Sequence, residues 1–410
     1  MTTENSKLAT MLSKVPEVTV FFWIIKVLCT TVGETASDFL NVNLNLGLTG
    51  TSIVAGVSLL VVLILQFRSK RYIPAIYWTA IVLISIFGTL VTDNLTDALG
   101  VPLEISTIIF SILLASTFAL WYAKEKMLSI HSIFTARREA FYWLTILFTF
   151  ALGTAAGDLM AESLGVGYAN TGIIICIVVA LIAIAWRLGL NAILAFWVIY
   201  IMTRPLGASL GDYLTQPQKY GGLGLGATMT TAIFIFAILA TVAFLSITKI
   251  DLTTKSATTK EDEKEVKQPG ALWQTVAVAL ILVSASLGGY YYRHKQLQAE
   301  IASVSVPNSS SSTTSVVKTI FPVADITDFK TIVQDALNMV NSGDLVGAKN
   351  RIADLEHDWD AAEGRLKTMS PTKWTEIDNA NDKVFRQLRA VNPNVDGSRS
   401  VLEELLKILG

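Results

Sequence analysis

The sequence predicts an all-α polytopic membrane protein, with eight helices in four parallel two-helix repeats, a ninth helix and a small soluble outer helical bundle. Three observations indicate this fold. First, 52% of the 410 residues are hydrophobic and only 16% are charged, whereas a typical soluble domain is about 25% charged. Second, nine segments are apolar over the roughly 20 residues that a spanning helix needs. Third, one pattern recurs four times, which indicates an internal repeat.

The repeated pattern consists of a tryptophan, a glycine ten residues later and an aspartate five residues after the glycine. The tryptophans are Trp23, Trp78, Trp143 and Trp197; the glycines are Gly33, Gly88, Gly153 and Gly207; the aspartates are Asp38, Asp93, Asp158 and Asp212. Ionisable groups inside a membrane are costly and usually functional. The aspartates are therefore candidates for a functional site.

The first eight apolar segments form four pairs, and the first member of each pair carries the pattern. The nine segments are 18–40, 48–67, 73–92, 105–122, 141–160, 170–186, 188–210, 223–247 and 271–292. Because each pair crosses the membrane twice, the four copies point the same way, about an axis along the membrane normal. The sequence thus predicts a four-repeat transmembrane domain over 18–248 and a ninth transmembrane helix over 271–292.

The basic residues predict the orientation. Lys and Arg gather in the connections after the second, fourth, sixth and eighth segments, whereas the other connections hold only Lys219. By the positive-inside rule, the N-terminus (1–17) and a charged linker (249–270) are expected in the cytoplasm. A Ser-rich linker (293–323) and a helical bundle (324–410) are then expected in the periplasm or outside the cell, with the protein in an inner or plasma membrane.

The outer bundle is predicted from three apolar stripes with helical spacing, within 329–340, 345–366 and 374–391. Ser370 and Pro371 suit the N-cap and the first position of the third helix. Ser400 and Glu403 form a capping box, which predicts the start of a last short helix.

The aspartates are expected at one depth, near the outer ends of their helices, where a ring of carboxylates would bind or relay cations. Glu34 lies one turn below Asp38, and Asp97 and Glu162 follow the aspartates of the second and third copies by four residues. The alternative is that these are helix-end residues that touch outer water. A carboxylate at a helix C-terminus is unfavourable to the helix dipole, which favours the functional interpretation.

Hydroxyl groups add to this candidate site. Thr51, Ser106 and Thr171 occupy equivalent places near the outer starts of the second helices, with Thr228 nearby. Together with the aspartates they would form an all-oxygen site for a hard cation. The alternative is that they are ordinary N-cap residues.

Two basic residues lie inside apolar segments. Arg204 is expected to neutralise one carboxylate, Asp212 or a neighbour, and Lys26 is expected to snorkel to the cytoplasmic face. Both would thus balance the charge of the acids. Pro205 implies a kink or break in the seventh helix, and a purely structural ion pair explains Arg204 equally well.

The repeat glycines and tryptophans have simpler interpretations. Gly33, Gly88, Gly153 and Gly207 each precede a second small residue by four positions, a spacing that lets membrane helices pack closely. The tryptophans are interpreted as interfacial anchors or as packing residues.

Other classes of function find no support in the sequence. It contains no Walker loop, no H-E-x-x-H, no nucleophile elbow and no dinucleotide fingerprint. We therefore expect no enzyme and no cofactor. The net charge of −1 gives no sign of a nucleic-acid partner. The expected partners are the lipid bilayer, an inorganic cation as substrate, and a protein partner at the outer bundle if that bundle performs recognition.

One stretch carries a resemblance to a known family. Val15-Pro16-Glu17-Val18-Thr19 leads into Phe22-Trp23, and Thr30-Thr31-Val32-Gly33-Glu34-Thr35 follows. This resembles the opening repeat of an uncharacterised family of bacterial membrane-anchored proteins with four tandem two-helix repeats. The resemblance covers 15–248 and implies a four-repeat helical membrane domain and a bacterial source, but no substrate.

The sequence therefore leads to two hypotheses of function. The first is a cation transporter, for a divalent metal ion or coupled to protons, in which the repeat aspartates bind or relay the ion. The second is a membrane-anchored sensor or scaffold that transports nothing and binds a partner or ligand through its outer bundle. The sequence leaves the ion, and the identity of any metal, open.

Overall fold

The computed structural model describes residues 14–43, 46–99, 101–215, 223–251, 271–304, 321–390 and 393–410. Every regular element within these ranges is helical. Nine of their helices are long and apolar enough to cross a membrane, as predicted, so the chain is a multi-pass membrane protein. These helices are α2 (Val20–Asp38), α3 (Gly47–Arg68), α4 (Pro74–Asp93), α5 (Leu103–Glu125), α6 (Ala136–Asp158), α7 (Tyr168–Arg187), α8 (Ala192–Thr215), α9 (Gly226–Thr248) and α11 (Ala271–Val304).

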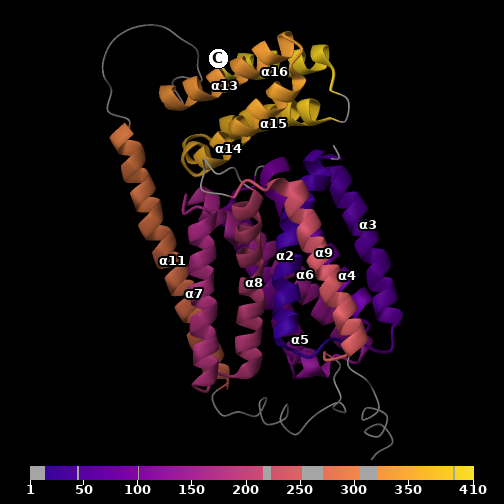
Figure 1. Cartoon of the computed structure of the whole chain (residues 1–410). Coiled ribbons are helices and arrows are strands. Elements are labelled where there is room, and N and C mark those ends of the chain that lie inside the picture. The colour runs from indigo at the N-terminus through magenta and orange to yellow at the C-terminus, as the bar shows by residue number, and fades with distance from the viewer. Residues whose placement is uncertain are drawn as a thin grey trace, which may run out of the picture.

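Helices α2 to α9, which we call the membrane body, form two layers (Figure 1). The inner layer is a ring of the four helices that carry the repeat pattern: α2 packs on α4 and α8, and α6 packs on the same two helices. Around it, α3 packs on α4, α5 on α6, α7 on α8, and α9 on α2. The second helix of each repeat thus packs on the first helix of the next repeat, and the last repeat returns to the first.

The repeat glycines lie where neighbouring inner helices come closest. A Cβ atom added at any of them would collide with the residue that lies three positions before the glycine of the next copy. Such an atom would lie 1.9 Å from Ser85 Oγ at Gly33, 2.7 Å from Phe150 Cβ at Gly88, 2.5 Å from Arg204 Cβ at Gly153, and 1.9 Å from Thr30 Oγ1 at Gly207. Each contact of the ring therefore needs a glycine.

Three of the inner helices end in a π-helical turn. These turns are η1 (Phe39–Asn43), η2 (Asn94–Ala98) and η4 (Leu159–Ser163), and each begins directly after a repeat aspartate. The fourth copy differs, because α8 continues as an α-helix to Thr215. Single π-helical turns are rare and occur frequently at functional sites. No feature of the sequence predicted these turns.

Two features of the helices differ notably from the prediction. Helix α11 continues to Val304, past the predicted start of the Ser-rich linker at 293, because the intervening sequence contains no Gly or Pro to end it. Helix α8 runs through Pro205 as one continuous element, so the seventh helix is not broken there.

The C-terminal region folds as four helices: α13 (Val323–Asn341), α14 (Leu345–Met369), α15 (Pro371–Arg389) and α16 (Val395–Leu409). Their apolar stripes are buried against one another, around stacked Trp359 and Trp374 rings whose centroids lie 3.8 Å apart. Ser370 caps α15 and Pro371 begins it, as predicted. The capping box at Ser400 is wrong: α16 starts earlier, because the side chain of Asn394 caps it.

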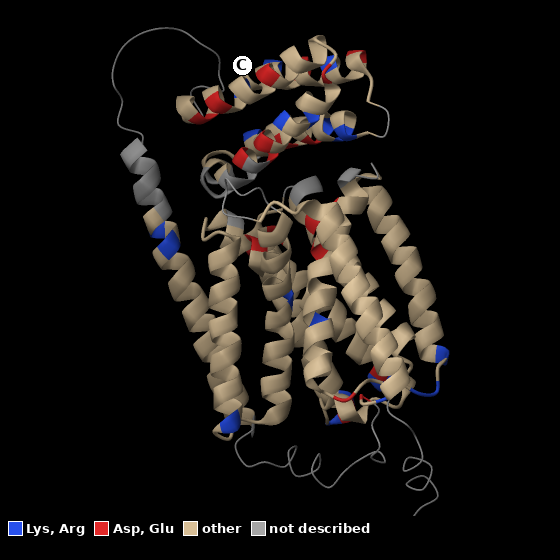
Figure 2. Ribbon diagram, in the orientation of Figure 1, with Lys and Arg blue, Asp and Glu red and all other residues tan. Residues whose placement is uncertain are grey.

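These four helices lie over the end of the ring where the repeat aspartates are found (Figure 1), since α14 contacts η4 and α15 contacts η1. We call this end of the membrane body the bundle end. At the opposite end, which we call the linker end, lie residues 14–17 and the loop 126–135. Figure 2 shows acidic residues inside the body near the bundle end and basic residues gathered at the linker end.

Candidate ion site in the four-helix ring

The side chains between the four inner helices come from positions four residues apart, because residues i and i+4 share one face of a helix. Counted from the repeat glycine, these are positions −11, −7, −3, +1 and +5. In chain order the layers are Phe22, Tyr77, Tyr142 and Phe196; Lys26, Ile81, Ile146 and Tyr200; Thr30, Ser85, Phe150 and Arg204; Glu34, Thr89, Thr154 and Ala208; and the four repeat aspartates. The layers at −7 and −3 are fully buried.

Arg204 is the central side chain of the ring, with only 1% of it exposed. Its guanidinium group forms a salt bridge with Glu34 (Nη2–Oε2, 2.5 Å). It also donates to Thr154 Oγ1 (2.9 Å from Nη2 and 3.1 Å from Nε), to the carbonyl oxygen of Thr30 (2.9 Å) and to Thr89 Oγ1. One side chain of α8 thus connects α2, α4 and α6.

The partners of Arg204 follow the repeat. Glu34, Thr89 and Thr154 each come directly after the repeat glycine of their copy. The salt bridge goes to the first copy, whereas the sequence pointed to Asp212 or a residue near it. A rigid, planar group with five donors suits this position, because it can bond to three neighbouring helices at once.

Lys26 lies one layer closer to the linker end, and the expectation that it snorkels is wrong. Its side chain is 1% exposed, and its Nζ lies 3.9 Å from the ring centroid of Phe150 and 4.2 Å from that of Tyr200. This Nζ has no hydrogen-bond partner. The faces of the two rings attract a cation, and the amine is held inside the ring of helices.

The repeat aspartates lie at the bundle end, where Asp38 is exposed and the other three are partly buried. The carboxyl group of Asp158 interacts with those of Asp93, Asp212 and Glu34. Asp38 interacts with Glu34 and, across the boundary with the C-terminal helices, with Glu356 and Arg389. The structure therefore brings the four acids of the predicted ring to one end of the inner helices.

Two predicted acids cannot be judged in the same way. Asp97 lies in η2 and Glu162 in η4, but their side chains lie outside the described part of the structure. Among the side chains that the structure does describe, no group of three or more His, Cys, Asp or Glu residues is arranged to hold a metal ion.

The hydroxyl groups of the second helices are not N-caps. Thr51, Ser106 and Thr171 lie inside the first turns of their helices, beyond N-cap residues Leu46, Pro102 and Gly167. All three side chains are fully buried, and their hydroxyl oxygens have no hydrogen-bond partner. The buried hydroxyl group of Thr230 on α9 is also without a partner.

The C-terminal helices add a further ion pair above the acids. Arg389 of α15 donates to both carboxylate oxygens of Glu356 on α14, at 2.8 Å and 2.5 Å. This bidentate pair is the part of the bundle that interacts with Asp38.

The linker end is closed by polar contacts that the sequence did not predict. Lys14 Nζ forms a salt bridge with Glu139 (2.6 Å), and Gln66 Nε2 donates to the other oxygen of that carboxylate (3.1 Å). All three side chains are buried. The sequence could not predict that these three residues contact one another, because they come from three separate segments without a shared pattern.

A second contact at the linker end joins Tyr72 to Asp251 (OH–Oδ2, 2.6 Å), while Trp78 Nε1 donates to the same phenol oxygen. Burial raises the pKa of the Asp251 carboxyl group above its ordinary value, and the hydrogen bond from Tyr72 opposes that rise. Burial also raises the pKa of the Tyr72 phenol, to which the bond with Asp251 adds.

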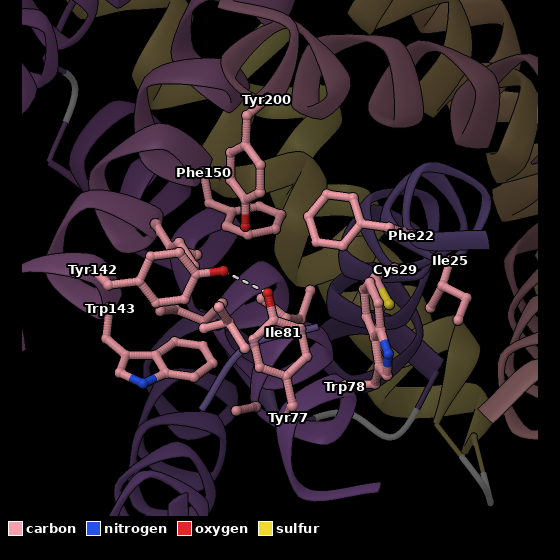
Figure 3. Close-up of a cluster of buried hydrophobic side chains, with 14 of the residues drawn as sticks. Phe22, Ile25, Cys29, Tyr77, Trp78, Ile81, Tyr142, Trp143, Phe150 and Tyr200 are labelled. Carbon is pink, nitrogen blue, oxygen red and sulfur yellow. Dashed lines mark hydrogen bonds between the residues drawn. The ribbon is translucent and has the colours of Figure 1, made fainter. Parts of the chain in front are cut away.

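Three of the repeat tryptophans lie in a buried aromatic cluster near the linker end, and Figure 3 labels two of them, Trp78 and Trp143. Trp78, Trp143 and Trp197 are buried, and they make edge-on contacts with neighbouring tyrosine rings. This favours the packing interpretation over the anchor. In the same cluster the hydroxyl groups of Tyr77 and Tyr142 are hydrogen-bonded at 2.5 Å, as the dashed line in Figure 3 marks.

Comparison with known proteins agrees with the internal repeat. A family model described as Repeat of Unknown Function (DUF347) matches residues 21–72, 76–127, 141–188 and 195–251. Each matched segment contains one copy of the pattern, and together they cover about half of the chain. No curated protein and no solved structure matches. The chain therefore belongs to the DUF347 family, with four tandem copies of its repeat.

Proposed function

We propose that the membrane body transports an inorganic cation, which the repeat aspartates bind at the bundle end. The observation that supports this proposal is that the four repeat aspartates occupy one position of the repeat at the bundle end of the inner helices, where the charges of Asp93, Asp212 and Glu34 act on Asp158. Like charges repel one another, so a cation that binds between such carboxylates is attracted and held. Carboxyl groups in apolar membrane helices are costly, and their recurrence at one position of all four copies favours a functional role.

The path of the ion follows the axis of the ring. Below the aspartates, the Arg204–Glu34 salt bridge lies across this path and balances one negative charge. A cation that binds near Glu34 competes with the guanidinium group for the carboxylate, so that binding of the ion and packing of the four helices are coupled. Two kinds of cation fit carboxylate oxygens: a divalent metal ion and a proton.

The basic linker end supports a definite orientation. By the positive-inside rule, we assign the linker end to the cytoplasm and the bundle end to the periplasm or the exterior, in a bacterial inner or plasma membrane. The four repeats then run parallel about an axis along the membrane normal, and the C-terminal helices form an outer bundle. A cysteine placed at Asp396, which is 93% exposed, should react with a membrane-impermeant thiol reagent in intact cells.

The direct test is ion flux in proteoliposomes. The variant with Asp→Asn at Asp38, Asp93, Asp158 and Asp212 should lose most of its flux, measured across a panel of mono- and divalent cations and protons. A matched control removes four exposed acids of the C-terminal helices: Asp328, Asp396, Glu403 and Glu404. It should keep the flux. Equal flux in the intact chain and the quadruple Asp→Asn variant would refute the proposal.

The second hypothesis, a sensor or scaffold, keeps one supporting observation: α14 and α15 contact the π-helical turns η4 and η1, so the bundle could report on the state of the ring. Deletion of 305–410 separates the two functions. A transporter should still move ions after this deletion, with altered kinetics. A sensor should lose its cellular function entirely, while its membrane body remains folded.

A further inference from the structure

One buried group has no role in the function proposed so far. The amine of Lys26 lies within the ring of helices without a hydrogen-bond partner, between the rings of Phe150 and Tyr200. Lys26 and Tyr200 occupy equivalent positions in the first and fourth copies, while the second and third copies have Ile81 and Ile146 there. The layer thus has one amine and one phenol opposite two aliphatic side chains.

This environment tolerates both forms of an amine. The two ring faces stabilise the ammonium form. The absence of any acceptor removes the hydrogen bonds that would otherwise hold the proton in place, since a buried charge normally needs such partners. The hydroxyl group of Tyr200 is also buried without a partner. Two polar groups that could exchange a proton therefore face the same apolar layer.

The surroundings of Lys26 connect the two ends of the ring. On its own helix, Cys29 lies next to it, and Glu34 lies two turns away towards the bundle end. From α8 it faces Tyr200 and Arg204, and the charge of Arg204 acts on its amine. Towards the linker end lie the hydrogen-bonded hydroxyl groups of Tyr142 on α6 and Tyr77 on α4. Helix α9, which also packs on α2, carries no titratable residue.

We propose that Lys26 carries a proton through the middle of the ring, between the Arg204–Glu34 salt bridge and the tyrosines Tyr200, Tyr142 and Tyr77. This inference rests on the proposed function and names the proton as an ion that the site moves. In the step itself, a proton binds to the lone pair of Nζ to give an ammonium group, and its release on the other side restores the amine. No bond other than N–H forms or breaks.

The chemistry of the layer favours a proton over a metal ion. Ile81 and Ile146 of this layer, and Phe150 of the next layer towards the bundle end, offer no oxygen ligand, and hard cations need several. The next layer, at −3, is also tightly packed, because Ser85 of that layer lies directly against Gly33. A proton needs only a lone pair. Since two positive charges repel, an ammonium group at Lys26 weakens the hold on Arg204, which couples passage of the proton to the salt bridge above it.

The test is proton flux in proteoliposomes that contain a pH-sensitive dye, driven by an imposed membrane potential. Lys26→Met, which cannot bind a proton, and Lys26→Arg, which cannot release one, should both lower the flux about a hundredfold, the scale of a lost proton-transfer group. Lys26→His should restore part of the flux and move the pH at which it is half-maximal. Ile146→Met is the matched control in the same layer and should leave the flux within about twofold of the intact chain.

The outcomes separate this inference from the proposed function. If Lys26→Met and Lys26→Arg conduct protons like the intact chain while the quadruple Asp→Asn variant does not, the inference is wrong and the proposed function stands. The same holds if the intact chain moves another cation but no protons. If the intact chain moves no ion, both are wrong. Should Lys26→Met fail to fold, an unchanged pH profile in Lys26→His would still overturn the inference.

Discussion

Arg204 on α8 forms a salt bridge with Glu34 on α2 although 170 residues separate them in the chain. The two residues belong to the fourth and first copies of the repeat, so this pair closes the ring at the level just below the aspartates. Thr89 and Thr154 complete the contact from the second and third copies. A single guanidinium group therefore depends on all four copies at once.

This pair gives the first prediction. Glu34→Leu leaves a buried guanidinium group without its counter-charge and should lower the free energy of unfolding by about 3–5 kcal/mol. The double variant Glu34→Leu, Arg204→Met should be more stable than Glu34→Leu alone. Unfolding in detergent, followed as a double-mutant cycle, measures the coupling. Strictly additive effects would contradict a direct interaction between the two side chains.

The second prediction concerns the helix contacts of the ring. Gly33→Ala places a Cβ 1.9 Å from Ser85 Oγ and should destabilise the protein by about 1–3 kcal/mol. Ser85→Gly in the same chain should relieve part of the loss. The control is Gly50→Ala on α3, where the nearest atom to an added Cβ lies 3.6 Å away, and this change should be neutral or stabilising. Equal effects at the two glycines would refute the close packing.

The third prediction concerns the linker end. Lys14→Ala leaves the fully buried carboxylate of Glu139 without its ammonium partner and should cost about 3–5 kcal/mol of stability. It should also expose the linker end to added protease. Lys70→Ala, which removes an exposed lysine from the same end, should do neither. If both variants behave alike, the Lys14–Glu139 contact contributes nothing.

The fourth prediction is a dependence on pH. Because the pKa of Asp251 is raised in the folded protein, the folded state holds this proton more tightly than the unfolded state. The contribution to stability is therefore present at low pH and is lost as the pH rises from the ordinary value of 3.8 through the raised one. Asp251→Asn should flatten this part of the stability curve. An unchanged curve would show that Asp251 is not the group responsible.

The sequence predicted the membrane helices well, because a bilayer demands long apolar segments and the nine segments satisfy that demand. It also showed which helices are equivalent, since the pattern from Trp23 to Asp38 recurs at fixed spacing, and these four helices form the inner ring. Helix ends were less certain. The start of α16 depends on the side chain of Asn394, a local choice between two capping residues that spacing alone cannot decide.

The partners of the charged residues could not be predicted in the same way. Snorkelling was a reasonable expectation for Lys26 from its distance to the helix end, but the direction of its side chain is set by how α2 lies against α8. The sequence did not indicate a partner for Glu139 or Gln66, because each is a polar residue near a helix end, where solvent exposure is usual. One signal was present: the position directly after the repeat glycine holds Glu34, Thr89 and Thr154, and two steps of four residues back from Glu34 lead to Lys26.

The second helix of each repeat packs on the first helix of the next repeat, and this arrangement determines when each inner helix gains its outer partner during synthesis. Helix α2 is the first helix of the membrane body to be synthesised, whereas its outer partner α9 is the last. Until the fourth copy has been inserted, α2 lacks both α8 and α9. Glu34 therefore lacks its salt bridge with Arg204 during this time. Early intermediates in the membrane are thus open arcs, which insertion factors or lipid must shield until the final copy arrives.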